Sequence, residues 1–534
     1  MIKKACILPY FLLLLFTASG QQPKTSLLYD FVKEHRQTSR ITDSIGLFKR
    51  TAIAPTAKIN ASLSQKQMLV IDKQASLKIY NDKAASISLD IPSTAGNSYK
   101  VELVKQDING SGSVITDTIT GIGTGHKTGT TQGLHYRGYI NGDPLSMASF
   151  SVFANGEVML LFSNDKGNFN VGSAGNNNDE YVLYNSKDLV ASPAFSCGAM
   201  PVNDISSIQQ TTMLQTAAVP TILCKKVQVY WEADYKLFSQ NFNSNLANTT
   251  NYLTGLFNQV AVMFQNEGII IELADTYIWV TPDPYNTSSG SNALSTFKTR
   301  WNNLNNTFKA DVALLIGGGT AHNGGIAYIP SGLCAKKYAY GYVNVSGAYS
   351  AVPVYSWDVY SATHEIGHIF GSYHTHWCGW NTGPGGTCGA IDDCETLEAS
   401  GTCNTCPVST SIKPSAPAGF SGTVMSYCHL KSGIGVNLSN GFGPLPGALI
   451  RSYVNNATCL VADNRWTGVT NTAWENAGNW SCGSIPTSTT DVIISSGLNN
   501  YPVISNSAIC RKIVQQPNTK VTVKTGGTLT LTGK

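Results

Sequence analysis

The sequence predicts an α/β unit in the middle of the chain, preceded by a β-rich unit and followed by a small all-β module. Strand-like and helix-like stretches alternate over residues 222–462, which is typical of an α/β fold. Short apolar stretches between Gly, Asn and Asp turns fill residues 21–205, and the helical signal is absent beyond Cys459. A chain of 534 residues is too long for one domain, so about three are expected.

Composition excludes some classes of function. Apolar residues make up 42% of the chain and charged residues 13%, which indicates a folded protein and not a disordered one. The formal charge of +4 is the small difference between 36 basic and 32 acidic residues, and no long basic run is present. We therefore expect no nucleic-acid partner. We expect the chain to act as a monomer.

Residues 1–20 have the pattern of an export signal. Two lysines precede an apolar run from Ala5 to Phe16, and small residues at Ala18-Ser19-Gly20 form a cleavage site. The run is shorter than the roughly 18 residues that a membrane span needs, and no other stretch reaches that length. The protein is expected to be secreted, so its 13 cysteines are expected to form disulfides.

The β-rich unit comes first and is followed by a linker. Stretches such as 86–89 and 158–162 are typical of strands, and the Ser/Gln/Thr-rich residues 206–221 predict an exposed linker open to proteolysis.

The α/β unit of residues 222–462 follows, with strands expected at 227–231 and 312–316 and helices at 246–268 and about 295–304. Residues 463–534 contain Trp466, Trp474 and Trp480 before a series of short β pairs, which indicates a β module, a few rungs of a solenoid. These tryptophans are expected in the module's core in preference to a carbohydrate-binding face. The pattern is still running at Lys534, so we expect the natural protein to continue.

Residues 364–374 read HEIGHIFGSYH, which predicts a metal site. His364 and His368 are four residues apart, so they lie on one face of a helix and can reach one ion. Gly371 ends the helix, and the turn brings His374 to the same ion as a third ligand. Three protein nitrogens leave one tetrahedral position open for water, as in a catalytic zinc site.

Glu365 is placed to act as general base and then general acid. It follows the first ligand, so it can take a proton from water at the open position and deliver it to the leaving amine. One zinc ion would lower the pKa of that water to about 7. A rival ligand set replaces His374 with Glu395 or Glu398; otherwise these acids face solvent or a calcium ion.

The eleven-residue string, followed 51 residues later by Met425 in Val424–Tyr427, resembles the metzincin metallopeptidases. The resemblance implies a catalytic domain with a twisted mixed sheet and an active-site helix. It implies that Met425 lies beneath the three histidines in a Met-turn. It makes Tyr427 a candidate oxyanion stabiliser, with a purely structural hydroxyl as the alternative.

Within the metzincins the chain resembles the reprolysin (adamalysin-like) group. The segment Gly325-Ile326-Ala327-Tyr328, followed by Cys334, is similar to that group's substrate-edge strand, to which an extended peptide adds as a further strand. The resemblance covers about residues 222–460 and suggests a disulfide between Cys334 and Cys459. The cysteine-rich insert 378–406 departs from the pattern and leaves the primed-side pocket undefined.

The segment His135–Ile140 resembles the reprolysin propeptide, and the C-terminal module resembles modules appended to secreted bacterial proteins. The resemblance implies that residues 21–205 are a propeptide in which Cys197 donates a thiolate to the zinc and blocks water, a cysteine switch.

Cysteine parity leaves an alternative open. If Cys334 joins Cys459, the six cysteines from 378 to 428 pair among themselves and Cys482 joins Cys510, then Cys197 and Cys224 remain and could bond to each other.

These features predict a secreted zinc metalloendopeptidase made as a zymogen. Its substrates would be proteins or peptides, and its own propeptide would be an intramolecular inhibitor. The alternative is an inactive adhesin or binding scaffold that retains the metal site. The presence of Glu365 favours the enzyme, because the base would often be lost first in an inactive relative.

Overall fold

The computed structural model describes residues 26–38, 44–93, 96–118, 127–129, 133–174, 179–190, 196–201, 223–305, 307–318, 324–329, 332–346, 354–382, 388–399 and 421–533. The predicted export signal and the predicted linker 206–221 lie outside these residues. None of the helices in the described ranges combines the length and the apolar character that crossing a membrane requires.

The N-terminal part of the chain builds a nine-stranded antiparallel sheet in the order β1-β2-β11-β10-β9-β8-β7-β4-β3. Its strands are β1 (Phe48–Arg50), β2 (Gln67–Ile71), β3 (Ser86–Pro92), β4 (Ser98–Gln106), β7 (Gly133–Ile140), β8 (Met147–Phe153), β9 (Val158–Asn164), β10 (Gly167–Ser173) and β11 (Glu180–Asn185). Helices α1 (Leu27–Thr38), α2 (Ala57–Ser62) and α3 (Lys73–Asp82) accompany the sheet. The strand-rich character was expected, but these three helices were not.

A second, mixed sheet of eight strands has the order β12-β16-β17-β15-β13-β14-β5-β6. The strands of the central part are β13 (Lys226–Ala233), β14 (Ile270–Trp279), β15 (Val312–Gly317), β16 (Gly324–Ile329) and β17 (Tyr340–Asn344). Four of them are parallel, and β16 runs antiparallel to β17.

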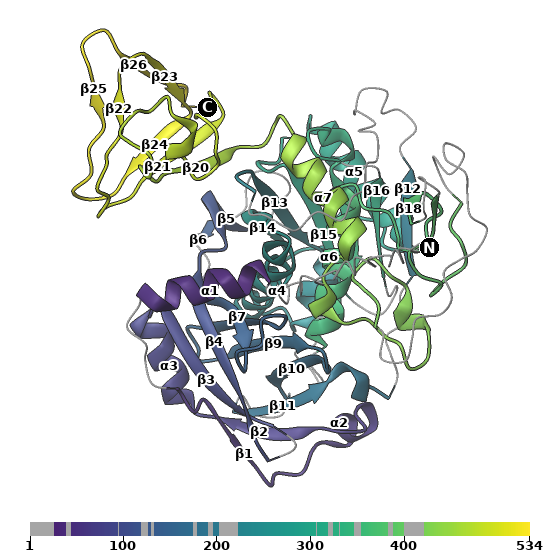
Figure 1. Cartoon of the computed structure of the whole chain (residues 1–534). Helices are drawn as coiled ribbons and strands as arrows, with labels where there is room; N and C mark the ends of the chain where they lie inside the picture. Colours follow the sequence, from purple (N-terminus) through teal and green to yellow (C-terminus); the bar gives the residue numbers. More distant parts are fainter. Residues whose placement is uncertain are drawn as a thin grey trace, which may run out of the picture.

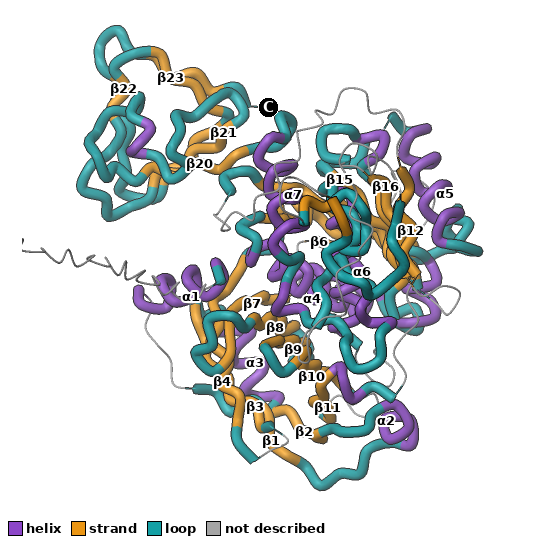
Figure 2. Tube along the Cα trace, turned by 45° about the vertical axis from the view of Figure 1, so that its right-hand side comes forward, coloured by secondary structure: helices purple, strands orange, loops and turns teal. Residues whose placement is uncertain are grey.

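Four helices accompany this sheet: α4 (Leu246–Asn266), α5 (Gly290–Asn303), α6 (Tyr355–Ile369) and α7 (Pro444–Asn456). Side chains alternate along the strands, so one sheet face packs against α4 and α6 and the other against α5. Figures 1 and 2 show α4 between this sheet and the N-terminal one.

Strands from the N-terminal part occupy both edges of the second sheet. β5 (Asn109–Thr118) pairs in parallel with β14, and β6 (Lys127–Gly129) follows it. At the other edge, β12 (Ser196–Pro201) pairs in parallel with β16. Residues 21–205 were expected to form a separate unit, because periodicity in the sequence reports local structure and not which strands pair at long range.

The C-terminal module consists of short parallel strands stacked on one another, as expected for a solenoid. The pairs are β20 (Ala462–Trp466) with β21 (Thr490–Ile494) and β24 (Lys512–Gln515), β22 (Val503–Ile504) with β25 (Thr522–Val523), and β23 (Ser507–Cys510) with β26 (Thr528–Leu531). Trp466, Trp474 and Trp480 are buried in its core, as expected. The module stands apart from the N-terminal sheet (Figure 1).

The disulfides confirm one expected pairing and correct two. Cys334 bonds to Cys459, as the resemblance suggested. Cys224 bonds to Cys482. The expected bond between Cys482 and Cys510 is therefore wrong, and so is the alternative bond between Cys197 and Cys224. The first residues of β20 lie beside the chain at Cys224, where Asp463 N donates to Cys224 O at 2.8 Å, and parity counting cannot reveal this contact. Cys197 and Cys510 are free thiols.

Candidate metal centre

Helix α6 carries His364, Glu365 and His368 on buried positions, and the chain turns back directly after it. Gly371 makes this turn at φ 100°, a left-handed conformation that favours glycine. A Cβ there would lie 2.4 Å from the ring of Tyr453 on α7, so the turn also needs the missing side chain. The turn brings His374 back toward the helix, as the spacing predicted.

The three imidazoles converge through their Nε2 atoms. His368 Nε2 lies 3.1 Å from His364 Nε2 and 3.1 Å from His374 Nε2. Two nitrogens that ligate one tetrahedral zinc at about 2.0–2.1 Å are about 3.3 Å apart, so the three atoms have close to the spacing of a shared ion.

An oxygen atom faces the other nitrogen of each ring. Nδ1 of His364 lies 2.7 Å from Val424 O, Nδ1 of His368 lies 2.7 Å from Ser372 O, and Nδ1 of His374 lies 2.8 Å from Glu398 Oε2. These acceptors place the proton on Nδ1, so each Nε2 presents a lone pair. Three lone pairs that converge repel one another unless a cation lies between them.

The surroundings of His364 and His368 hold these two rings neutral. Burial, followed by the neighbouring histidines, lowers the pKa of His364 well below its usual range and that of His368 to about 3. A metal ligand must be unprotonated, so this environment suits coordination.

Cys197 completes the cluster from a different part of the chain. Its Sγ lies 3.5 Å from His368 Nε2, and the four donor atoms of Cys197, His364, His368 and His374 all lie within 4.8 Å of one another. A sulfur and a nitrogen on one tetrahedral zinc are about 3.5 Å apart when Zn–S is about 2.3 Å. The donor set of three imidazoles and one thiol therefore fits a zinc ion.

Strand β12 places Cys197 beside the predicted substrate-edge strand, β16. Cys197 pairs with Gly325, and the register continues through Ile326, Ala327 and Tyr328. An extra strand was expected on this edge, and here the chain's own segment supplies it. The backbone of Cys197 is held further by Tyr427, whose hydroxyl accepts from Cys197 N at 3.1 Å and donates to Cys197 O at 2.8 Å.

Glu365 lies against the edge strand at its glycine. A Cβ on Gly325 would be 2.2 Å from Glu365 Oε1, so no larger residue fits between the strand and the carboxylate. Glu365 is fully buried, and burial raises its pKa well above its usual range. The sequence predicts Gly325 only as part of the edge strand, because a local pattern does not show which side chain packs against a glycine.

The predicted Met-turn packs against α6. Met425 is fully buried, and a Cβ on Gly367 would lie 2.8 Å from its Sδ. Val424 supplies the carbonyl that orients His364. The turn and the helix thus fit together at a glycine that lies between the two helical histidines.

The cysteine-rich insert supplies Glu398, the carboxylate that orients His374. Backbone hydrogen bonds fix it, since Glu398 N donates to His376 O and Cys378 N donates to Glu398 O, each at 3.0 Å. The rival ligand set placed Glu398 on the ion instead of His374. In the structure His374 joins the cluster and Glu398 Oε2 lies behind its ring.

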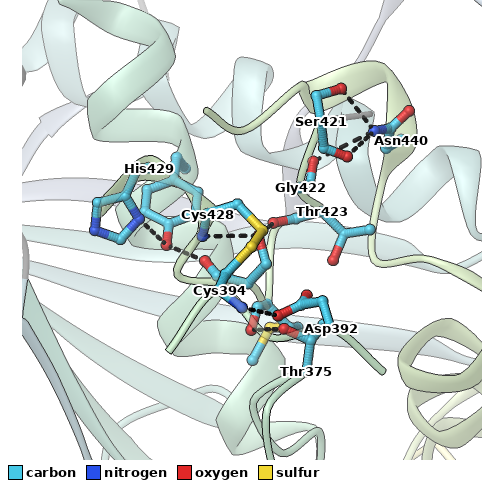
Figure 3. Close-up of a disulfide and its surroundings, with 12 residues drawn as sticks. Thr375, Asp392, Cys394, Ser421, Gly422, Thr423, Cys428, His429 and Asn440 are labelled. Carbon is cyan, nitrogen blue, oxygen red and sulfur yellow. Dashed lines mark hydrogen bonds between the residues drawn. A yellow bond between two sulfur atoms is a disulfide. The ribbon is translucent and has the colours of Figure 1, made fainter. Parts of the chain in front are cut away.

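A disulfide ties the insert to the turn that carries Tyr427. Cys394 bonds to Cys428, the residue after Tyr427 (Figure 3). Within the insert, Asp392 Oδ1 accepts from Cys394 N at 3.2 Å, and Trp380 Nε1 donates to His374 O at 2.6 Å. The insert therefore braces the third histidine from both its side chain and its backbone.

Comparisons with known proteins agree with this centre. The family model described as metallo-peptidase family M12 (Reprolysin_5) matches residues 224–432, which contain α6 and the Met-turn. This match supports a metzincin-like zinc peptidase. A domain of unknown function (DUF8693) matches residues 465–534.

The curated proteins contain no match to this chain. Among solved structures, one titled "Structure of a chaperone-substrate complex" is 20% identical with a TM-score of 0.22, and the match covers 29% of this chain and 25% of that one. The chain thus spans a quarter of that structure.

Proposed function

We propose that the chain is a secreted zinc metalloendopeptidase held latent by its own residue Cys197. The observation that carries the proposal is the convergence of one thiol and three imidazole nitrogens at one point beside Glu365. His364, His368 and His374 would hold the zinc ion. When bound, zinc polarises water and the scissile carbonyl and lowers the pKa of that water.

The chain's own groups would then act on an extended substrate. The edge strand β16 binds the substrate backbone by adding it to the sheet, at the place that β12 occupies in the latent form. Glu365 accepts a proton from the attacking water and returns it to the leaving amine. The hydroxyl of Tyr427 donates a hydrogen bond to the developing oxyanion once it no longer bonds to Cys197 O.

Latency follows from the same contacts. Cys197 Sγ occupies the fourth corner of the donor set, and the strand around it covers the edge where a substrate would pair. Cleavage within the predicted linker, residues 206–221, would be the activating step. The disulfides of the described residues fit an extracellular location, where such bonds persist.

The test compares the precursor with the cleaved form on an unfolded protein substrate such as casein, with and without a zinc chelator. The cleaved form should be active, and the chelator should abolish its activity. Glu365→Gln should lower kcat by roughly 10²–10⁴-fold while zinc remains bound at one ion per chain. Hydrolysis that is indifferent to the chelator and to Glu365→Gln would overturn the proposal in favour of a binding scaffold.

A further inference from the structure

The N-terminal sheet and the central unit share one hydrophobic core. Helix α4 has 16 consecutive buried residues from Thr249 to Phe264 out of 21. A surface helix buries only one stripe, so both faces of α4 are covered. One face packs on β14 and α6, and the other packs on β7, β8 and α1. Figure 2 shows the helix between the two layers.

The fit of α4 against the N-terminal sheet is close. A Cβ on Gly255 of α4 would lie 2.4 Å from Met159 Sδ of β9, so a glycine is needed for the helix to approach the strand. Leu28, Val32, Tyr139, Met147, Phe153 and Leu161 from the N-terminal part join the same buried cluster as α4. Separating the two parts would expose this apolar surface to water.

Buried polar groups of the two parts also satisfy one another. Asn258 of α4 is fully buried, and its amide nitrogen lies within hydrogen-bond distance of four oxygens of β7 and β8, to which its two N–H groups can donate: the carbonyls of Tyr136 and Phe150 and the hydroxyls of Ser149 and Ser151. Its Oδ1 accepts from Nε of Arg137 at 2.9 Å, and Arg137 Nη1 donates to Gln265 Oε1 at 3.0 Å. A buried guanidinium that loses such partners is strongly destabilised.

The N-terminal sheet also supports the helix that carries the histidines. At the start of α6 the N-cap residue Val354 offers no side-chain hydrogen bond. Asn170 of β10 caps the first turn instead, because its Oδ1 accepts from Ser356 N at 2.8 Å and its Nδ2 donates to Ser356 Oγ at 3.1 Å. Without β10, the first turn of the active-site helix would lose this partner.

A third set of contacts joins β9 and β10 to the segment after the Met-turn. Ser163 Oγ donates to Asn437 Oδ1 at 2.7 Å, Asn437 Nδ2 donates to Asn164 O at 2.7 Å, and Leu438 N donates to Asn168 Oδ1 at 2.8 Å. Ser163, Asn168 and Asn437 are all buried. These contacts are independent of strand β12, which blocks the edge of the second sheet.

We propose that residues 26–190 are a permanent half of the enzyme and stay bound to the rest of it after the chain is cut within the predicted linker, residues 206–221. Only the segment around Cys197 is displaced from the centre, and the active species is a non-covalent complex of two chains. This inference rests on the proposed function for its account of activation. The association itself follows from the shared core and does not require that the protein be a peptidase.

The experiment uses the full chain with Glu365→Ala, so that self-digestion cannot occur, and a recognition site for a specific protease inserted between residues 206 and 221. After complete cleavage, both fragments should elute together in size-exclusion chromatography at the mass of the uncut chain and separate only in denaturant. Separate elution of two folded fragments would overturn the proposal.

A second arm tests the interface itself. Asn258→Ala, which leaves Arg137 Nε without its partner, should weaken the association of the cleaved fragments by roughly 10–100-fold. Asn248→Ala, on the same helix outside its fully buried stretch, is the matched control and should leave the association unchanged. Equal association of both variants would contradict the assigned interface.

Co-elution can be scored whether or not the chain hydrolyses peptides. If the cleaved chain with Glu365 intact is inactive but the fragments co-elute, the proposed function fails and the shared core stands. If the central part is active after the N-terminal fragment has been removed, the peptidase stands and the permanent half is wrong.

Discussion

Nδ1 of His374 lies 2.8 Å from Oε2 of Glu398, a residue of the cysteine-rich insert. The other two histidines are oriented by backbone carbonyls, so His374 alone among the three depends on a side chain that can be removed by mutation. The insert that departs from the reprolysin pattern thus reaches the candidate metal centre from behind the third histidine.

Removing that carboxylate should weaken metal binding. We predict that Glu398→Ala raises the zinc dissociation constant by roughly 10–100-fold, because the ring of His374 loses the partner that fixes its orientation and tautomer. Competition with a chromophoric chelator measures this. Glu395→Ala is the matched control, since Glu395 bonds to Thr396. Equal zinc affinity in the two variants would show that Glu398 has no role.

The thiol switch predicts a constitutively active precursor. Cys197→Ser should allow the uncut chain to hydrolyse casein, because the fourth donor position becomes accessible to water. Cys510→Ser removes the other free thiol of the described residues, which is buried in the C-terminal module, and this precursor should stay latent. If the Cys197→Ser precursor is as inactive as the wild-type precursor, strand β12 and not the thiol maintains latency.

Tyr427 should affect both latency and catalysis. Tyr427→Phe removes the hydroxyl that bonds Cys197 N and O, so the uncut precursor should hydrolyse casein faster than the wild-type precursor does. In the processed form, kcat should fall by roughly 10–100-fold with KM little changed, because the oxyanion loses a donor. Tyr360→Phe is the control, since that hydroxyl donates to Ser426 O. An unchanged kcat would mean that Tyr427 only holds Cys197 in the precursor and takes no part in catalysis.

The clearance at Gly325 predicts a sharp steric effect. Gly325→Ala places a methyl group 2.2 Å from Glu365 Oε1, so the carboxylate or the strand must shift and kcat should fall by at least about 10-fold. Zinc content should be unchanged, which separates this effect from metal loss. Gly290→Ala meets Ile326 at an ordinary 3.4 Å and serves as the control. Full activity of Gly325→Ala would contradict the observed fit.

His135 predicts a pH-dependent stability of the N-terminal sheet. Burial, and then Arg137, lower its pKa to about 3, while the unfolded value is about 6.5. Protonation therefore favours the unfolded chain, and the stabilisation present above pH 6.5 is lost as the pH falls toward 3. Between pH 7 and pH 5 the free energy of unfolding should fall by about 2 kcal/mol because of this residue.

Urea denaturation at these two pH values measures the effect. In His135→Asn, which can still bond Ser151 Oγ, the free energy of unfolding should fall by about 2 kcal/mol less than in the wild type between the two pH values. Identical pH dependence in the wild type and in His135→Asn would mean that His135 is not the titrating group.

Local patterns predicted the parts of the centre that lie close together in sequence. The spacing within residues 364–374 placed two histidines on one helical face and a third across a glycine turn, and the structure brings all three together. Helix α4, expected at 246–268, runs from Leu246 to Asn266. Such features depend on periodicities of a few residues, which the sequence displays directly.

Long-range relationships could not be predicted in the same way. The pairing of Cys224 with Cys482, the addition of β5 to β14 and the position of Glu398 behind His374 each join segments separated in the chain. Nothing in the local residue pattern distinguishes these partners from other candidates. Cys197 was an exception, because resemblance to a propeptide supplied the distant relationship.

The coordination of the precursor tests the central claim most directly. Zinc X-ray absorption spectroscopy of the purified, uncut chain should show one sulfur at about 2.3 Å and three nitrogens at about 2.0–2.1 Å, at one zinc per chain. The sulfur contribution should disappear in Cys197→Ser and persist in Cys510→Ser. A precursor purified without zinc, or zinc without a sulfur neighbour in the wild-type chain, would contradict the account.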